Sequence, residues 1–172
     1  MTTRIKKAGS NSGINNIHEI HSIKIGIVQS QWNDTITNKL LNGAKKVLID
    51  KGIQADNLLV HQVPGAFELP LGAKLLLNHA KLDAVICLGC VIKGDTDHDK
   101  YINHAVANGI TQLGLLSNIP IIYGVLTPNN EEQALERSGG KEGNKGEEAA
   151  YTALNMILLK RNLHTEKKSI GY

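Results

Sequence analysis

Apolar residues gather in four short segments that recur along the chain, at 23–29, 58–63, 84–92 and 121–126. Continuous apolar segments of this length are typical of strands covered on both faces of a sheet. Between them, apolar residues recur at helical spacing. Examples are Ile36, Leu40, Ala44, Val47 and Leu48 in the first interval, Leu71, Leu75 and Leu76 in the second, and Ile102, Ala105, Val106, Ile110 and Leu113 in the third.

Strands that alternate with helices predict an α/β fold with a four-stranded parallel sheet, right-handed crossovers and helices on both faces. Ligands of such folds bind beyond the carboxyl ends of the strands. With 172 residues, 41% of them hydrophobic, the chain can bury one core, and we expect a single domain over 22–163. The polar, aperiodic segments 1–21 and 164–172 are predicted to be mobile tails.

Charge narrows the possible partners. The formal net charge is +3, but the two tails hold five of the 19 basic and two of the 16 acidic residues. The body of the chain, residues 22–163, therefore has 14 basic and 14 acidic residues and no net charge. A neutral body argues against nucleic-acid binding. No stretch reaches the roughly 18 apolar residues of a membrane span, and the N-terminus lacks the apolar core of a signal peptide. We therefore expect a soluble, cytoplasmic protein.

Two cysteines, Cys87 and Cys90, form a C-x-x-C pair inside the third apolar segment. A redox pair of this spacing requires a helix N-terminus, whose dipole lowers the pKa of a thiol. Because these cysteines lie within a predicted strand, we expect two buried thiols and no disulfide framework.

The single tryptophan and the single phenylalanine, Trp32 and Phe67, lie in the loops after the first and second strands. Flat rings beside the Pro64-Gly65 turn suit stacking on a planar heterocycle while backbone amides approach its edge. The alternative is that both rings fill gaps under the loops. Glu68 is either a first-turn carboxylate favoured by the helix dipole or an acceptor for sugar-like hydroxyls.

The loop after the third strand, Gly94-Asp95-Thr96, precedes a helix predicted to begin near His98. Free N–H groups at that helix end outline an anion site, or an ordinary cap. The guanidinium of Arg137 could clamp a phosphate bidentately, or be solvated on a helix surface. His98 is the best candidate for proton transfer because imidazole titrates near neutral pH.

No metal site is predicted. Residues 95–99 imitate the start of a calcium loop, but Lys100 and Val106 stand where that loop needs Gly and Glu. His98 and His104, six residues apart, fall on different faces of a helix and do not suit one metal ion.

Four ordered motifs over about 23–160 resemble lumazine synthases. They are Val-Pro-Gly-Ala-Phe-Glu-Leu-Pro at 63–70, Leu-Gly-Cys-Val-Ile-Lys-Gly-Asp-Thr-Asp-His at 88–98, Gly-Val-Leu-Thr at 124–127 with Gln133, Ala134 and Arg137, and Gly-Asn-Lys-Gly at 143–146. The resemblance implies a flavodoxin-like three-layer α/β/α sandwich. It also implies condensation of 5-amino-6-ribitylaminouracil with 3,4-dihydroxy-2-butanone 4-phosphate to 6,7-dimethyl-8-ribityllumazine, phosphate and water, without cofactor or metal.

The resemblance also implies the roles of individual residues. For the first substrate, Trp32 would stack on the pyrimidine with Asn33 beside it, the backbone of Cys90, Val91 and Ile92 would meet its edge, and Ala66, Phe67 and Glu68 would hold the ribityl chain. Asp95, Thr96 and Arg137 would hold the phosphate, with Lys145 nearby, and His98 would move protons. Tyr123 matches a position that lines the site from an adjacent subunit. Many family members have an aromatic residue where this chain has Asp99, whose carboxylate would raise the pKa of His98 on contact.

Two other functions share this scaffold. A flavin-binding or flavin-storage protein would need no phosphate site. A phospho-receiver domain would need an acidic cluster at the ends of the first and third strands, which Gln29 and 91–93 do not supply.

Assembly is predicted on two grounds. A four-stranded sheet is narrow, so a site with distant rims is more easily closed between neighbours. The resemblance implies a homopentamer, and the short, glycine-rich link Ser138–Asn144 favours further assembly into an icosahedral shell, because glycines permit a tight kink.

Overall fold

The computed structural model describes residues 20–170. The main elements are β1 (Ile25–Ser30), α2 (Asp34–Asp50), β2 (Leu58–Val63), α3 (Leu69–His79), β3 (Ala84–Cys90), α4 (His98–Ser117), β4 (Ile121–Leu126), α5 (Glu131–Glu136) and α6 (Lys145–Ile170). Short elements complete the chain, namely the 3-10 turns η1 (Ala55–Asn57) and η2 (Ala66–Glu68) and the strands β5 (Ser138–Gly140) and β6 (Gly143–Asn144). The four predicted strands are confirmed, and β2 and β4 have the predicted bounds.

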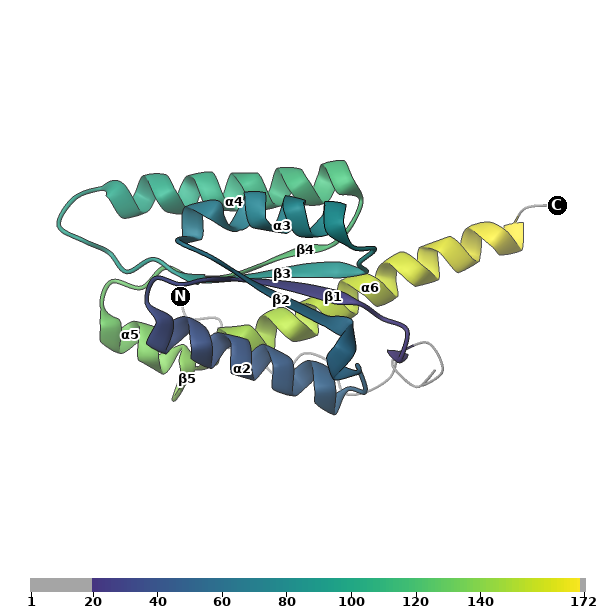
Figure 1. Cartoon of the computed structure of the whole chain (residues 1–172), viewed down its shortest axis with the longest axis horizontal. Coiled ribbons are helices and arrows are strands. Elements are labelled where there is room, and N and C mark those ends of the chain that lie inside the picture. Colours follow the sequence, from purple (N-terminus) through teal and green to yellow (C-terminus); the bar gives the residue numbers. More distant parts are fainter. Residues whose placement is uncertain (1–19, 171–172) are drawn as a thin grey trace.

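The four long strands form one parallel sheet in the order β2-β1-β3-β4. Helices α3 and α4 cover one face, and α2, α5 and α6 cover the other, so the three-layer α/β/α sandwich is confirmed (Figure 1). The central strands β1 and β3 are buried throughout. At the edge, β2 is only partly covered, and His61 and Gln62 on it are exposed. Burial on both faces therefore holds for the central strands and not for this edge.

Each face of the sheet carries its own apolar core. Successive residues of a strand point to opposite faces. On β3, Ile86 and Leu88 join the core under α2 and α6, whereas Val85 and Cys87 join the core under α3 and α4. The alternation explains why a continuous apolar segment is needed at the centre of the sheet.

The apolar face predicted for α2 is fully buried, but the one predicted for α3 is wrong at two positions. Leu71 and Leu75 are exposed, and α3 instead packs through Leu69, Ala73 and Leu76. Three leucines at helical spacing look equivalent along the chain. The close approach of Gly72 to β1 and β2, where a Cβ would lie 2.9 Å from Val28 and 2.7 Å from Val63, turns the helix so that Leu71 and Leu75 point outward.

Both ends of the described chain differ from the predicted boundaries. Ile20 is buried in the core under α2 and α6, and residues 1–19 of the predicted N-terminal tail lie outside the described residues. In the C-terminal segment 164–172, predicted to be a mobile tail, residues 164–170 instead continue α6, which ends at Ile170 and extends beyond the sheet (Figure 1). Residues 171–172 lie outside the described residues. Between Gly146 and Gly171 the sequence has no glycine or proline that would end a helix.

The two cysteines are free and buried on β3, as predicted. Burial raises the pKa of the Cys87 thiol to about 12 and that of Cys90 to about 11. Only the thiolate attacks disulfide reagents. We therefore expect both thiols of the native protein to react only slowly with such a reagent at pH 8. In the chain unfolded in guanidinium, both thiols should react. Rapid labelling of one thiol in the native protein would contradict this burial.

Within 20–170, no helix is long and apolar enough to cross a membrane. The described residues also hold no group of three or more His, Cys, Asp or Glu side chains placed to ligate a metal ion.

Candidate active site

The loops after β1, β2 and β3 are joined by hydrogen bonds at the carboxyl edge of the sheet. Asn33 adopts a left-handed conformation with φ of 58° just before α2, and its Nδ2 donates to the carbonyl of Cys90 over 2.9 Å. The Trp32 N–H donates to the carbonyl of Pro64 over 3.2 Å. Left-handed backbone is tolerated by Asn better than by most residues, which suits this sharp turn. These bonds hold three loops, from segments far apart in sequence, as one surface.

Trp32 and Glu68 meet at Gly65 on that surface. A Cβ added to Gly65 would lie 3.6 Å from the Trp32 indole and 3.1 Å from Glu68 Oε2. The Gly65 N–H donates to the same Oε2 over 2.9 Å, so Glu68 caps its own turn. Its Oε1 has no hydrogen-bond partner in the part of the chain that the structure describes, and this oxygen is the one that can receive a ligand hydroxyl.

Both aromatic rings of these loops face outward. Trp32 is 70% exposed and Phe67 is 56% exposed, while Ala66 between the loops is buried. Rings that filled gaps under the loops would be buried, so the gap-filling alternative does not describe the folded chain. An exposed indole beside a glycine, which has no side chain to cover it, is a stacking surface for a flat ring.

The loop between β3 and α4 projects away from the sheet (Figure 1). Its start runs beside the loop after β4, where the N–H of Val91 donates to the carbonyl of Leu126 over 2.9 Å. The Cys90 carbonyl accepts from Asn33, so this carbonyl and the Val91 N–H both have hydrogen-bond partners within the chain. Ile92, the next residue, is half-buried.

Asp95, Thr96 and His98 are all exposed near the end of that loop. Helix α4 begins at His98, as predicted, and the His98 N–H donates to Thr96 Oγ1 over 3.4 Å. Asp97 makes no side-chain cap and instead pairs with Lys100 over 2.7 Å. Among the described residues, the side chain that accepts from the start of α4 is therefore that of Thr96.

The side chain of Asp99 is partly buried, unlike that of His98. Its Oδ1 is buried and has no hydrogen-bond partner among the described residues, and the same holds for Asn103 Oδ1 one turn later. Successive residues of a helix point about 100° apart. The side chain of Asp99 is therefore turned to the half-buried side of α4 while His98 is exposed.

A second group of residues lines a cleft of about 620 Å³ beyond the end of β4. Arg137 at the end of α5 and Lys145 at the start of α6 bring positive charge into the cleft, and Tyr123 of β4 lines it as well. Burial raises the pKa of Tyr123, which keeps its hydroxyl protonated and able to donate.

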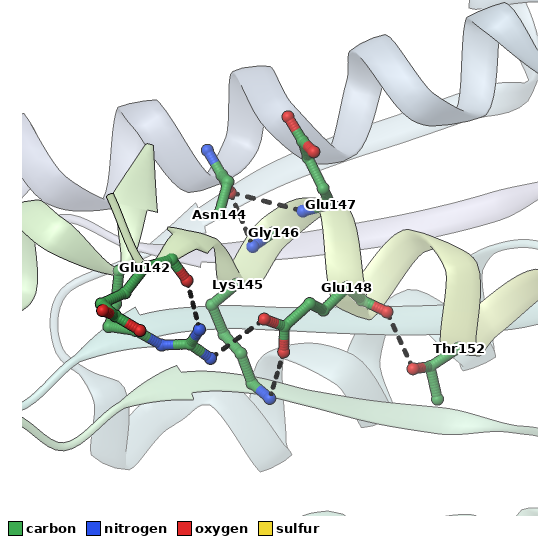
Figure 2. A network of polar contacts seen from close by, with 8 residues as sticks. Glu142, Asn144, Lys145, Gly146, Glu147, Glu148 and Thr152 are labelled. Atoms are coloured by element: carbon green, nitrogen blue, oxygen red, sulfur yellow. Dashed lines mark hydrogen bonds and ion pairs between the residues drawn. The ribbon is translucent and has the colours of Figure 1, made fainter. Parts of the chain in front are cut away.

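Glu148 joins the two cations of this cleft and was not anticipated from the sequence. Arg137 Nη2 lies 3.0 Å from Glu148 Oε1. Lys145 Nζ lies 3.1 Å from Oε2 (Figure 2). The sequence could have indicated half of this cluster, because Lys145 and Glu148 are three residues apart in the first turn of a helix and so lie on one face. No spacing in the sequence predicts the pairing of Glu148 with Arg137, which lies 11 residues away.

The link between α5 and α6 is a small hairpin, and its glycines have the freedom that the sequence predicted. Gly139 has φ of 126° and Gly143 has φ of 86°, conformations that favour glycine. Asn144 then begins α6, because its Oδ1 accepts from the Gly146 N–H over 2.8 Å (Figure 2). Its Nδ2 donates to the Lys39 carbonyl of α2 over 3.0 Å.

The profile of the 6,7-dimethyl-8-ribityllumazine synthase family matches residues 22–161. The chain belongs to this family. A 6,7-dimethyl-8-ribityllumazine synthase of Cytophaga hutchinsonii is 50% identical over 157 residues, which cover 91% of this chain and 98% of the relative. Synthases of Parabacteroides distasonis and Bacteroides fragilis are 48% and 50% identical, over 83% and 78% of this chain and 89% and 94% of their own lengths.

In this member of the lumazine synthase family, the single chain brings the predicted site residues into two separate groups. The aromatic loops with Trp32 and Glu68 form one group, and the cleft with Arg137 and Lys145 forms the other. Asp95, Thr96 and His98 are not among the residues that line the cleft, although all of these segments lie at the carboxyl edge.

Proposed function

We propose that the chain is a 6,7-dimethyl-8-ribityllumazine synthase, a transferase of riboflavin biosynthesis. It condenses 5-amino-6-(D-ribitylamino)uracil with 3,4-dihydroxy-2-butanone 4-phosphate and releases phosphate and water. The observation that carries this function is the pairing of two surfaces at one edge of the sheet. An exposed indole over Gly65 suits a flat heterocycle, and a cleft that holds Arg137 and Lys145 suits a phosphate.

In the proposed site, Trp32 stacks on the pyrimidine, with Asn33 beside it and the backbone of Cys90, Val91 and Ile92 at the ring edge. Glu68 Oε1 accepts from the ribityl hydroxyls, flanked by Ala66 and Phe67. Asp95, Thr96 and Arg137 hold the phosphate, and Lys145 supports them. His98 moves protons between the reacting amine and carbonyl groups.

The two groups of residues complete one another between copies of the chain. The outward-facing Trp32 and Phe67 leave the heterocycle surface open on one side. A residue such as Tyr123 from a neighbouring copy closes it in the proposed homopentamer. A groove of about 630 Å³ along β4 supports association, because it is lined by apolar residues that include Leu115, Leu159 and Leu163, all exposed.

The function is tested by mixing the purified protein with both substrates. We expect the absorbance of the lumazine to appear together with one equivalent of free phosphate. Riboflavin binding without phosphate release would instead support the flavin-storage function, since riboflavin has no phosphate to occupy the cleft.

His98→Ala is expected to impair the enzyme without abolishing its activity. An amine and a ketone held side by side gain most of their rate from proximity, so a proton-transfer group adds less. We expect kcat to fall by about 100-fold or less. His104→Ala, which removes another exposed imidazole of α4, is the control and should leave kcat unchanged. If the His98→Ala protein reacted no faster than the substrates without enzyme, proximity would not supply most of the rate, and this prediction would be wrong.

The proposed assembly extends from pentamer to a hollow icosahedral shell. The hairpin between α5 and α6 is short and turns through positive-φ glycines without an insertion, which supports the shell. Light scattering and native mass spectrometry should find a particle far larger than two pentamers. A particle no larger than that, across pH and phosphate concentration, would defeat the shell, and a stable active monomer would defeat the shared site.

A further inference from the structure

Helix α2 begins without the side-chain cap that its first residue could supply. Asn33 is the N-cap of α2, a position where Asn is preferred because its side-chain oxygen can accept from the N–H groups of the first turn. Here the Asn33 side chain makes no such bond, and its Nδ2 donates to the Cys90 carbonyl. Asp34 Oδ1 accepts from the Thr35 N–H, but this bond lies within the turn. The place of the first turn on the sheet therefore depends on other groups.

Gln29 supplies a direct link from the sheet to that turn. It is the second-last residue of β1 and is only 1% exposed. It lies on the same face of β1 as Ile25 and Ile27, which belong to the core under α2 and α6. Its Nε2 donates to Thr37 Oγ1 over 3.2 Å and to Asn38 Oδ1 over 2.8 Å. Both donors of this amide are thus used on one helix.

The orientation of the Gln29 amide is set from its other side by β2. Gln62 Nε2 donates to Gln29 Oε1 over 3.4 Å, and Gln62 Oε1 accepts from Gln31 Nε2 over 3.4 Å. Because the Gln29 oxygen faces Gln62, its nitrogen faces α2. A buried amide is costly unless its hydrogen bonds are kept, so these contacts hold the end of β1 and the start of α2 in one arrangement.

The loop that Gln29 spans carries the proposed contacts to the pyrimidine. Trp32 and Asn33 lie between the end of β1 and the start of α2. The Asn33 carbonyl accepts from the Thr37 N–H over 3.0 Å, and the Thr37 hydroxyl accepts from Gln29. A shift of the first turn of α2 would therefore move Asn33 and, with it, the neighbouring indole.

We propose that Gln29 is a positioning residue for the pyrimidine substrate. Its amide fixes the first turn of α2 to the end of β1 and so holds Trp32 and Asn33 in the geometry that receives the heterocycle. Because Gln29 is buried, it acts through these two residues and does not touch the substrate. This inference rests on the proposed function. The alternative is a purely structural role, in which Gln29 only satisfies buried polar atoms.

Two variants of the full-length protein separate these roles. Gln29→Met keeps a long, unbranched side chain and removes the amide. The fully buried Thr37 hydroxyl then loses its bond from Gln29, so stability should fall under either role. The double variant Gln29→Met with Thr37→Val makes both ends of that bond apolar. This change should restore stability, because neither end is left unpaired, but it does not restore the link between β1 and α2.

The matched control is Ser30→Ala, at the next residue of β1. The Ser30 hydroxyl is buried as well, but it has no hydrogen-bond partner among the described residues. This variant therefore removes a buried polar group from the same strand without breaking a hydrogen bond. We expect it to keep both KM values of the parent protein and to be at least as stable.

Trp32 is the single tryptophan of the chain, so its fluorescence reports on the loop directly. We measure the anisotropy of this fluorescence without substrate, KM for each substrate, and stability in urea. In both proteins that carry Gln29→Met, the anisotropy should fall. KM for the pyrimidine substrate should rise about five- to tenfold, with KM for the phosphate substrate unchanged. The double variant should regain most of the lost stability and keep the raised KM.

Three results would overturn the proposal. They are unchanged anisotropy or an unchanged KM for the pyrimidine substrate in the Gln29→Met protein, an equal rise in both KM values, and a double variant whose KM returns to the parent value together with its stability. If Gln29→Met fails to fold, Asn38→Ala decides. Asn38 is exposed and accepts the shorter of the two bonds, so its loss should raise the same KM roughly twofold.

The anisotropy needs no catalysis, which keeps the two proposals apart. A parent protein that forms no lumazine would refute the proposed function. An active parent whose variants keep the anisotropy and the KM values of the parent would refute the role of Gln29 alone.

Discussion

Replacing Gly146 with alanine is expected to destabilise the fold by about 3 kcal/mol or more. Gly146 lies in the first turn of α6, directly against the backbone of α2. A Cβ there would lie 1.9 Å from the carbonyl oxygen of Leu40 and 2.6 Å from its carbonyl carbon. Both obstacles are backbone atoms of a helix, so no side chain can move aside, and the two helices must separate.

Urea unfolding at matched subunit concentration measures this effect. The control is Gly94→Ala, because a Cβ at Gly94 would meet no atom within 4 Å. That variant should keep the stability of the parent protein or gain up to about 1 kcal/mol through the unfolded state. A Gly146→Ala protein as stable as the control would show that α2 and α6 do not approach as closely as described.

Arg137→Ala is expected to weaken the phosphate substrate by about 1.5 to 3 kcal/mol, because charge-assisted hydrogen bonds are lost. This corresponds to a rise in KM of roughly ten- to hundredfold. The pyrimidine substrate should bind as before, since Trp32 and Glu68 belong to the other group of residues. Arg137→Lys should recover only part of the affinity, because an ammonium cannot make the two parallel bonds of a guanidinium.

Steady-state kinetics with each substrate varied in turn checks this prediction, with the inhibition constant of inorganic phosphate as an independent measure. An unchanged apparent affinity for the phosphate substrate would mean that the phosphate lies elsewhere than beside Arg137. A parallel loss of pyrimidine affinity would indicate a general disturbance of the edge of the sheet.

Much of the fold follows from periodicity alone. Burial on a strand or helix leaves a local pattern of apolar residues, so β2, β4 and the buried face of α2 could be predicted residue by residue, and β1 and β3 to within two residues at each end. The parallel order then brings the loops after each strand to one edge, which is why motifs at 63–70 and 88–98 meet although they are distant in sequence. The buried state of Cys87 and Cys90 follows in the same way.

The extent of α6 and the face of α3 show where local patterns stop being informative. A polar segment without breakers continues a helix as readily as it forms a tail, so 164–170 were assigned wrongly. The three leucines of α3 are equivalent in spacing, and only the neighbouring strands select which of them is buried.

The sequence by itself determined the layers and the edge of the sheet at which the predicted site residues lie, and it predicts residue types that suit a heterocycle and a phosphate. Only the tertiary structure decided that Glu148 holds Arg137 from another helix, that Asn144 joins the start of α6 to α2, and that an oxygen of Asp99 is buried. The physical reason is a difference in range. Burial of apolar groups is non-directional and repeats along each element, whereas an ion pair or hydrogen bond depends on the positions of two atoms to within a few tenths of an ångström. Such positions are set by the packing of segments far apart in the chain.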